Sequence, residues 1–383
     1  MNRCNGQYGQ DKKPLHSKIS GLRRRSLAVS NVILSVGDIA TSVDVRATSA
    51  LPPKTDSSRT SLDVRFVPQG DISHSPLHTR PSQIGKPSYS AAWDLLARTG
   101  KGDAMSTEIH SAIDYYERHP ISSEIILVKL KTSRGNLNNV APEELFPHDQ
   151  DHYGGLGAND ALAERAAIGK DTRVVDFCAG LGGPARYLAH RYGADVTGIE
   201  LTPTRVKGAA ELTCLVGLQD SVRVIEGNVM RVPLPDASVD VVVSQEALLH
   251  VPDKERTLAE AFRILKPGGR IAFTDWVAHR PLSDDDKKLM WQGMAVADLY
   301  NPQTYAELIK KVGFTVNSVE DLTADWGIIL KQRLAMYIKL REETQQAGTP
   351  AGHDAFYESY VRFVDLVNEA VLGGGRFAGE KPR

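Results

Sequence analysis

The sequence predicts an α/β domain in which a mostly parallel β-sheet carries helices on both faces. Between about residues 165 and 325, apolar β-branched segments alternate with segments of helical spacing, as in strand–helix–strand units. The first strand, at 174–177, runs directly into a glycine-rich turn and then a helix opened by Pro184. A valine-rich segment at 239–244 is apolar along its length, as expected of a strand buried on both faces.

The other elements follow in chain order. Residues 107–133 show helical spacing that Pro120 divides into two helices, residues 134–158 are expected to form a loop, and residues 160–167 a short helix. We expect further strands at 195–200, 221–226 and 270–276 and from 313, and helices at 203–216, 253–265, 304–312, 327–345 and 353–372. A last strand at about 374–382 would make residues 326–372 a helical insertion.

Residues 1–104 differ in composition from the rest of the chain. They are rich in Ser, Thr, Pro and Arg and lack a pattern that would build a core. Three interpretations stay open: a disordered extension, a transit peptide, or sequence upstream of a true start at Met105. The folded domain is therefore expected at 105–383.

Charge and composition limit the kinds of molecule that this chain is expected to bind. The chain has 46 basic and 47 acidic residues, mixed along its length, which does not indicate a nucleic-acid surface. No apolar run approaches the ~20 residues of a membrane helix, and three scattered cysteines do not form a disulfide framework. We expect a cytoplasmic protein with a small-molecule partner. The sequence does not indicate its oligomeric state.

The glycine-rich turn after the first strand presents backbone N–H groups to a ligand. Gly180, Gly182 and Ala185 fit a dinucleotide fingerprint, with Glu200 as the later acid. Asp176, just before the turn, disfavours that interpretation because its carboxylate would face a pyrophosphate. The same carboxylate suits a cationic ligand. Glu200 ends the second strand, where a carboxylate can accept hydrogen bonds from both hydroxyls of a ribose.

This turn resembles the first motif of class I S-adenosylmethionine-dependent methyltransferases. Residues 241–250 (VVVSQEALLH) and 263–270 (RILKPGGR) resemble the fourth- and fifth-strand motifs of the same family, and the resemblance covers about 150–325. It implies a Rossmann-like sheet of seven strands in the order 3-2-1-4-5-7-6, with the last strand antiparallel and added N- and C-terminal helices. It also implies S-adenosylmethionine as cofactor, whose sulfonium and ammonium groups are the cations that Asp176 would meet.

The resemblance assigns cofactor contacts to residues at the ends of the first four strands. They are Asp176, Ala179, Gly180, Gly182, Glu200, Leu201, Asn228, Val229 and Gln245. Leu201 is expected to pack on one face of the adenine. Asn228 stands where family members usually carry an acid, and its carboxamide oxygen can still accept from the adenine amine.

His250 and Tyr153 are the candidate catalytic residues. His250 follows the fourth strand, at the sheet edge where ligands bind, and could accept a proton from the methyl acceptor. Such a base would titrate near ~6.5 if unperturbed; a structural histidine is the alternative. Tyr153 lies in a polar loop expected at the mouth of the site. The spacing of His148 and His152 in that loop is suggestive of metal ligands, but the turn-rich flanks do not aim both imidazoles, and we expect no metal.

The segment 244–250 and residues 321–323 look most like those of sarcosine/dimethylglycine and phosphoethanolamine N-methyltransferases. N-methylation of a small amine is therefore the expected activity. Alternatives are C- or O-methylation of a quinone, tocopherol-like, sterol-like or secondary-metabolite acceptor, and a non-catalytic cofactor-binding module. Trp291, Tyr300 and Trp326 could face a cationic product. Residues 279–300 would either pack as a helix or wall the substrate pocket.

Overall fold

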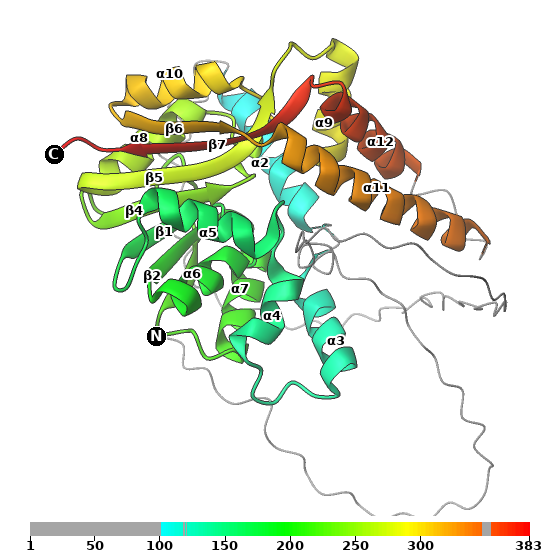
Figure 1. Ribbon diagram of the computed structural model, residues 1–383, viewed down its shortest axis with the longest axis horizontal. Coiled ribbons are helices and arrows are strands. Elements are labelled where there is room, and N and C mark those ends of the chain that lie inside the picture. The colour runs from blue at the N-terminus through cyan, green and yellow to red at the C-terminus, as the bar shows by residue number, and fades with distance from the viewer. Residues whose placement is uncertain (1–100, 118, 120, 347–353) are drawn as a thin grey trace, which may run out of the picture.

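The computed structural model describes residues 101–117, 119, 121–346 and 354–383. Within these residues a seven-stranded sheet has the order β3-β2-β1-β4-β5-β7-β6, and helices cover both of its faces (Figure 1). The pairs β3–β2, β2–β1, β1–β4 and β4–β5 are parallel, whereas β7 runs antiparallel to β5 and β6. The predicted Rossmann-like fold and its strand order are confirmed.

The elements have the following bounds. The strands are β1 (Arg173–Phe177), β2 (Asp195–Glu200), β3 (Val222–Glu226), β4 (Val239–Gln245), β5 (Leu265–Ala278), β6 (Thr315–Asp321) and β7 (Leu372–Glu380). The helices are α2 (Lys101–Glu117), α3 (Ser123–Arg134), α4 (Pro142–Asp149), α5 (Gly155–Ala166), α6 (Gly183–Tyr192), α7 (Pro203–Leu215), α8 (Lys254–Ile264), α9 (Asp284–Met294), α10 (Pro302–Val312), α11 (Thr323–Gln346) and α12 (Asp354–Asn368).

The two faces of the sheet bury separate cores, as the alternation of side chains along a strand requires. Val174 of β1 packs on one face with Leu188 of α6. Its neighbour Val175 packs on the other face in a core that includes Leu258 of α8 and Ile309 of α10. The carboxyl ends of β1, β2 and β4 consequently meet at one sheet edge between two fixed layers of helices.

Two helical groups extend beyond the sheet. Helix α2 packs against α7 and the short 3₁₀ turn Leu248–His250 that follows β4. Helices α9, α11 and α12 gather at the upper right of Figure 1 and share a core with Trp276 of β5. No helix in the described ranges is both long and apolar enough to cross a bilayer.

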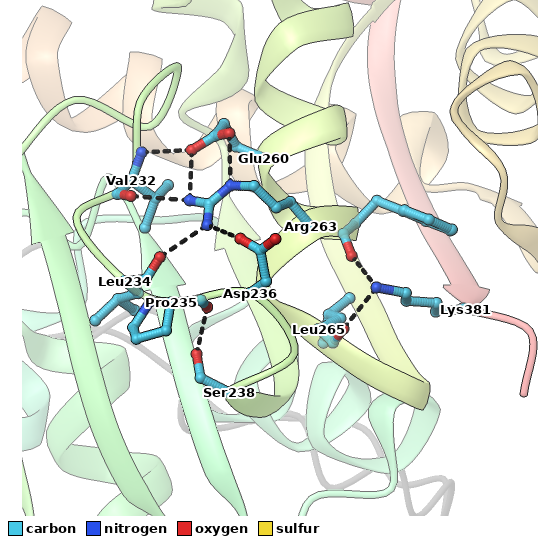
Figure 2. Close-up of polar contacts among 10 residues, drawn as sticks. Val232, Leu234, Pro235, Asp236, Ser238, Glu260, Arg263, Leu265 and Lys381 are labelled. Atoms are coloured by element: carbon cyan, nitrogen blue, oxygen red, sulfur yellow. Dashed lines mark hydrogen bonds and ion pairs between the residues drawn. The ribbon is translucent and has the colours of Figure 1, made fainter.

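The segment between β3 and β4 is fastened to α8 by one guanidinium group (Figure 2). Arg263 donates to both carboxylate oxygens of Glu260 at 2.9 and 2.8 Å and to Asp236 at 2.6 Å. It also donates to the carbonyl oxygens of Val232 and Leu234. These bonds fix the segment whose first residues, 228 and 229, are predicted to contact the cofactor.

One expectation about the N-terminal half needs correction. The predicted loop 134–158 contains α4, because Pro142 occupies the first helical turn and Glu143 and Glu144 favour the positive end of the helix dipole. Helix α2 (Lys101–Glu117) crosses the predicted boundary between 104 and 105, and the division of the chain near that point stays a prediction. The interpretations of residues 1–100 concern a segment outside the described residues.

Candidate active site

A cavity opens at the carboxyl ends of β1, β2 and β4, beneath α2. All of the predicted cofactor-binding residues except Gly182 line it: Asp176, Ala179, Gly180, Glu200, Leu201, Asn228, Val229 and Gln245. The imidazole of His250 lines the same cavity. The fold therefore brings together residues that lie as far apart in the sequence as Asp176 and His250.

Backbone geometry explains the composition of the glycine-rich turn. Gly180 and Gly182 have positive φ values of 55° and 75°, which glycine adopts without strain, and Cys178 has a φ of 58°, which is uncommon for a residue with a side chain. Gly182 shapes the turn by donating its N–H to the carbonyl oxygen of Ala179 at 2.8 Å. A side chain at Gly182 would press on Arg186, so its role is in the turn and not in the wall of the cavity.

Glu200 is held at the end of β2 by two backbone N–H groups. One carboxylate oxygen accepts from Gly180 at 2.9 Å, and the other accepts from Thr202 at 2.8 Å. The residue is 5% exposed. Because each carboxylate oxygen keeps a second acceptor position, both can still accept a hydroxyl group from a ligand.

Asp176 is a buried carboxylate with unmet bonding capacity. Its Oδ2 has no hydrogen-bond partner among the described residues. Burial, and then the charge of Glu200, raise the pKa of Asp176 to about 8. A cationic ligand would offset both effects by pairing with the charged form. This orphaned oxygen fits the sulfonium- and ammonium-bearing cofactor that the glycine turn predicts.

Two carboxamides complete the predicted cofactor wall. Oδ1 of Asn228 accepts from the backbone N–H of Met230 at 2.8 Å, which leaves one acceptor position for an adenine amine. Nε2 of Gln245 donates to Asn159 at 2.6 Å, and its Oε1 is buried without a hydrogen-bond partner among the described residues. Gln245 therefore offers an acceptor to a ligand.

His250 reaches the cavity together with Tyr116 of α2. The Tyr116 hydroxyl lies 2.9 Å from Nε2 of His250, and Nδ1 lies 3.0 Å from the carbonyl oxygen of Ala295. Because that carbonyl can only accept, the proton belongs on Nδ1 and the Tyr116 hydroxyl donates to Nε2. Burial lowers the pKa of His250 to about 4 and raises the pKa of Tyr116. Both groups are neutral in the resting site.

Glu246 is a second acid that lines the cavity, half-buried there, and it was not identified from the sequence. It follows β4 directly, has a φ of +51°, and accepts the backbone N–H of Tyr153 at 2.8 and 3.0 Å. Burial raises the pKa of Glu246. The sequence signal was an acid at the carboxyl end of a strand, as with Asp176 near the end of β1.

The ring of Tyr153 does not line the cavity. It packs in an aromatic cluster with Trp276 and Trp326, beneath the guanidinium of Arg333 at 4.5 Å. Tyr153 contributes to the site through its backbone N–H. Trp326 is buried in the same cluster, and Trp291 and Tyr300 likewise lie away from the lining.

The loop around His152 is polar and well paired. His152 lines the cavity, and its Nε2 lies 3.1 Å from Oε1 of Gln150. Asp149, just before it, forms a fully buried ion pair with Arg186 at 2.8 Å. Among the described residues no group of three or more His, Cys, Asp or Glu side chains is arranged to hold a metal ion.

Comparison with known proteins adds independent evidence. The family described as "Methyltransferase domain" matches residues 175–273. The chain is 30% identical over 225 residues to glycine/sarcosine/dimethylglycine N-methyltransferase of Actinopolyspora halophila, covering 58% of this chain and 38% of that protein. It is 34% identical over 169 residues to a probable chloroplastic tocopherol O-methyltransferase of Oryza sativa subsp. japonica, covering 41% and 45%. The chain thus spans less than half the length of these two curated relatives.

A solved structure agrees with the fold. Haemonchus contortus phosphoethanolamine N-methyltransferase 2, in complex with phosphomonomethylethanolamine and S-adenosylhomocysteine, aligns with a TM-score of 0.55 at 24% identity over 69% of this chain and 61% of that chain. The matched domain contains the glycine turn and the fourth- and fifth-strand motifs that carried the resemblance. The chain therefore carries a domain of the class I S-adenosylmethionine-dependent methyltransferases, with S-adenosylmethionine as its cofactor.

Proposed function

We propose that this chain transfers a methyl group to the nitrogen of a small amine, such as sarcosine or dimethylglycine. The choice of an amine rests on Glu246, a half-buried acid that lines the same cavity as Tyr116 and His250 and whose pKa is raised by desolvation. A desolvated carboxylate is costly unless it is paired, so such a position favours a cationic guest. The N-methyltransferase relative supports this choice.

The cofactor end of the cavity would be organised by two acids. Glu200, anchored by Gly180 and Thr202, would accept the ribose hydroxyls. Asp176 would face positive charge with its unpaired oxygen. When bound, S-adenosylmethionine supplies an electrophilic methyl group on a sulfonium. The protein's contribution is to fix both reactants and exclude water from them.

The Tyr116–His250 pair would orient the acceptor nitrogen. Because the Tyr116 hydroxyl donates to Nε2 of His250, the oxygen of Tyr116 is left with acceptor positions. In a secondary amine such as sarcosine, the N–H of the neutral form can donate to that oxygen and so direct the nitrogen lone pair elsewhere. Dimethylglycine carries an N–H only as the ammonium, so it would meet the pair through proton transfer alone. A proton leaving the ammonium form can move onto the Tyr116 oxygen as the original phenolic proton moves to Nε2 of His250. Glu246 would hold the positive charge of the amine before and after transfer.

Oxygen or carbon methylation is the second candidate. The relative named as a tocopherol O-methyltransferase supports it, and the Tyr116 oxygen could equally accept a phenol proton. Glu246 favours an amine acceptor, because a neutral phenol or quinone offers no charge to pair with a desolvated carboxylate.

A screen of acceptors for release of S-adenosylhomocysteine tests the proposal. Sarcosine, dimethylglycine and phosphoethanolamine would be compared with phenol, quinone and sterol acceptors on the wild-type chain and on Glu246→Gln. We expect turnover with an amine, and a raised KM for that amine in Glu246→Gln at unchanged affinity for S-adenosylhomocysteine. Turnover restricted to uncharged acceptors would overturn the amine assignment.

A further inference from the structure

We propose that Arg205 is a positioning residue that sets the Tyr116 hydroxyl against His250. The guanidinium carbon of Arg205 lies 4.5 Å from the centre of the Tyr116 ring, and Arg205 is 4% exposed. The inference rests on the proposed function, because it assumes that the Tyr116–His250 pair acts on the methyl acceptor.

The guanidinium joins three segments that meet at the cavity. Both of its terminal nitrogens lie 3.4 Å from Oδ2 of Asp151, in the loop after α4. One of them also donates to the carbonyl oxygen of Ile121, between α2 and α3, at 3.3 Å. Arg205 itself lies in the first turn of α7. The Tyr116 ring on α2 therefore rests on a group that is tied to both neighbouring segments.

This placement of Arg205 is unfavourable for folding alone. A cation in the first turn of a helix opposes the helix dipole. Burial of a guanidinium is costly unless all its donors are paired, and Nε of Arg205 has no partner within the described ranges. Arg186 is equally buried, but Asp149 pairs it fully on the Nε side. The contact with Tyr116 supplies a reason for an arginine at 205 that packing does not.

The planar shape of the guanidinium distinguishes Arg205 from a lysine at its contact with the Tyr116 ring. A guanidinium over an aromatic face can hold the ring against a flat, charged surface, which a lysine ammonium cannot do. Because the O–H bond of a phenol prefers the plane of its ring, the orientation of the Tyr116 ring sets the direction in which the hydroxyl donates to Nε2 of His250. A displacement of about 1 Å at such a group can lower turnover by about 10²-fold.

The test is a double-mutant cycle on kcat with the best amine acceptor. Arg205→Lys and Arg205→Met would be measured alone and in combination with Tyr116→Phe. If Arg205 acts through the hydroxyl, each single Arg205 variant loses about tenfold or more, and little further loss appears once Tyr116→Phe has removed that hydroxyl. Losses that multiply in the combined variants would contradict the proposal, as would full turnover in both Arg205 variants.

Arg376→Lys and Arg376→Met are the matched controls. Nε of Arg376 is also buried without a partner in the described part of the chain, and its guanidinium pairs with Glu320 at 2.8 Å away from the cavity. Both control variants should keep wild-type kcat. If Arg205→Met fails to fold, Arg205→Lys retains the charge and still tests the planar contact.

Hydrogen exchange of α2 in complex with S-adenosylhomocysteine gives a readout independent of turnover. The amides of residues 109–117 should exchange faster in the Arg205 variants than in the wild-type chain and the Arg376 controls. Unchanged exchange would contradict the role of Arg205. Absence of amine turnover in the wild-type chain would instead refute the proposed function, and the exchange result would still decide the positioning of α2.

Discussion

The hydroxyl of Tyr116 lies 2.9 Å from Nε2 of His250, although 134 positions separate the two residues in the chain. Tyr116 comes from α2 and His250 from the 3₁₀ turn after β4. The bond from Nδ1 to Ala295 fixes the tautomer of His250 and makes Nε2 the acceptor. The phenolic oxygen of Tyr116 is thereby left as an acceptor at the cavity.

Removing either member of this pair should lower turnover. In His250→Ala the Tyr116 hydroxyl loses its acceptor and can donate to the nucleophile instead, and in Tyr116→Phe the acceptor oxygen is gone. We expect losses of about 10²–10⁴-fold in kcat with near wild-type affinity for S-adenosylhomocysteine. Tyr187→Phe is the control, because its hydroxyl donates to Asp160 at 2.8 Å outside the cavity lining. Full turnover in a folded His250→Ala variant would end the catalytic role of His250.

The pH dependence of turnover should differ from that of an unperturbed histidine. Burial lowers the pKa of His250 to about 4, so the imidazole remains neutral and able to accept a proton until the pH approaches that value. A pH profile of kcat should therefore show no loss attributable to His250 near ~6.5. The opposite result would be a fall in kcat with a pKa near ~6.5 that is absent from the pH profile of His250→Ala. It would mean that water reaches the imidazole of His250 in the working enzyme.

Glu200→Ala should weaken binding of both S-adenosylmethionine and S-adenosylhomocysteine. The carboxylate accepts two backbone N–H bonds and would accept the ribose hydroxyls, and charged hydrogen bonds of this kind are worth about 1.5–3 kcal/mol. Calorimetry should show affinity lowered by about 10- to 150-fold. Glu226→Ala, at the exposed end of the neighbouring strand β3, is the control. Unchanged affinity in a folded Glu200→Ala variant would remove the ribose assignment.

Binding of S-adenosylmethionine should release a proton from Asp176. Burial and the charge of Glu200 raise the pKa of Asp176 to about 8, so the carboxyl is protonated in the empty site at lower pH. Pairing with a cation favours the ionised form, and affinity should therefore rise with pH up to about 8 and then level off. Calorimetry in buffers of different ionisation enthalpy measures the released proton. Equal proton release by Asp176→Asn and the wild-type chain would show that it comes from another group.

The strands and their ends could be predicted well from the sequence. The valine-rich β4 and the strand–turn–helix unit at β1 have strong local patterns, and the carboxyl ends of parallel strands must share one edge. Asp176 and Glu200 were therefore expected to face one ligand, and both line the cavity. The resemblance to the family supplied the strand order, which the structure confirms.

Long-range pairings could not be predicted. Tyr116 fits the apolar spacing of its helix, so nothing local distinguishes a packed ring from one whose hydroxyl reaches His250. The ring of Tyr153 turns into an aromatic cluster because Trp276 and Trp326, from elements far along the chain, lie beside it. Arg205 lies in the first turn of α7, where the helix dipole disfavours a cation. The sequence alone gives no reason for an arginine there, and the contact with the Tyr116 ring supplies one.

The buried ion pair between Asp149 and Arg186 should be important for stability. Both side chains are 0% exposed, so loss of one partner leaves an uncompensated buried charge. Urea denaturation of Asp149→Ala should show a loss of about 3–5 kcal/mol in the free energy of unfolding. Lys311→Met, which removes an exposed pair with Glu255, should change stability little. Equal, small effects of both substitutions would contradict a structural role for the buried pair.

The atom that receives the methyl group distinguishes N-methylation of a small amine from methylation of oxygen or carbon. Incubation of the wild-type chain with S-adenosylmethionine labelled with ¹³C at the methyl group, together with an amine acceptor, places the label directly on the product atom. Nuclear magnetic resonance of the product should then show a methyl carbon bonded to nitrogen, formed at a rate that falls sharply in Tyr116→Phe. A label found on oxygen or carbon of an uncharged acceptor, with no amine methylated, would contradict the account.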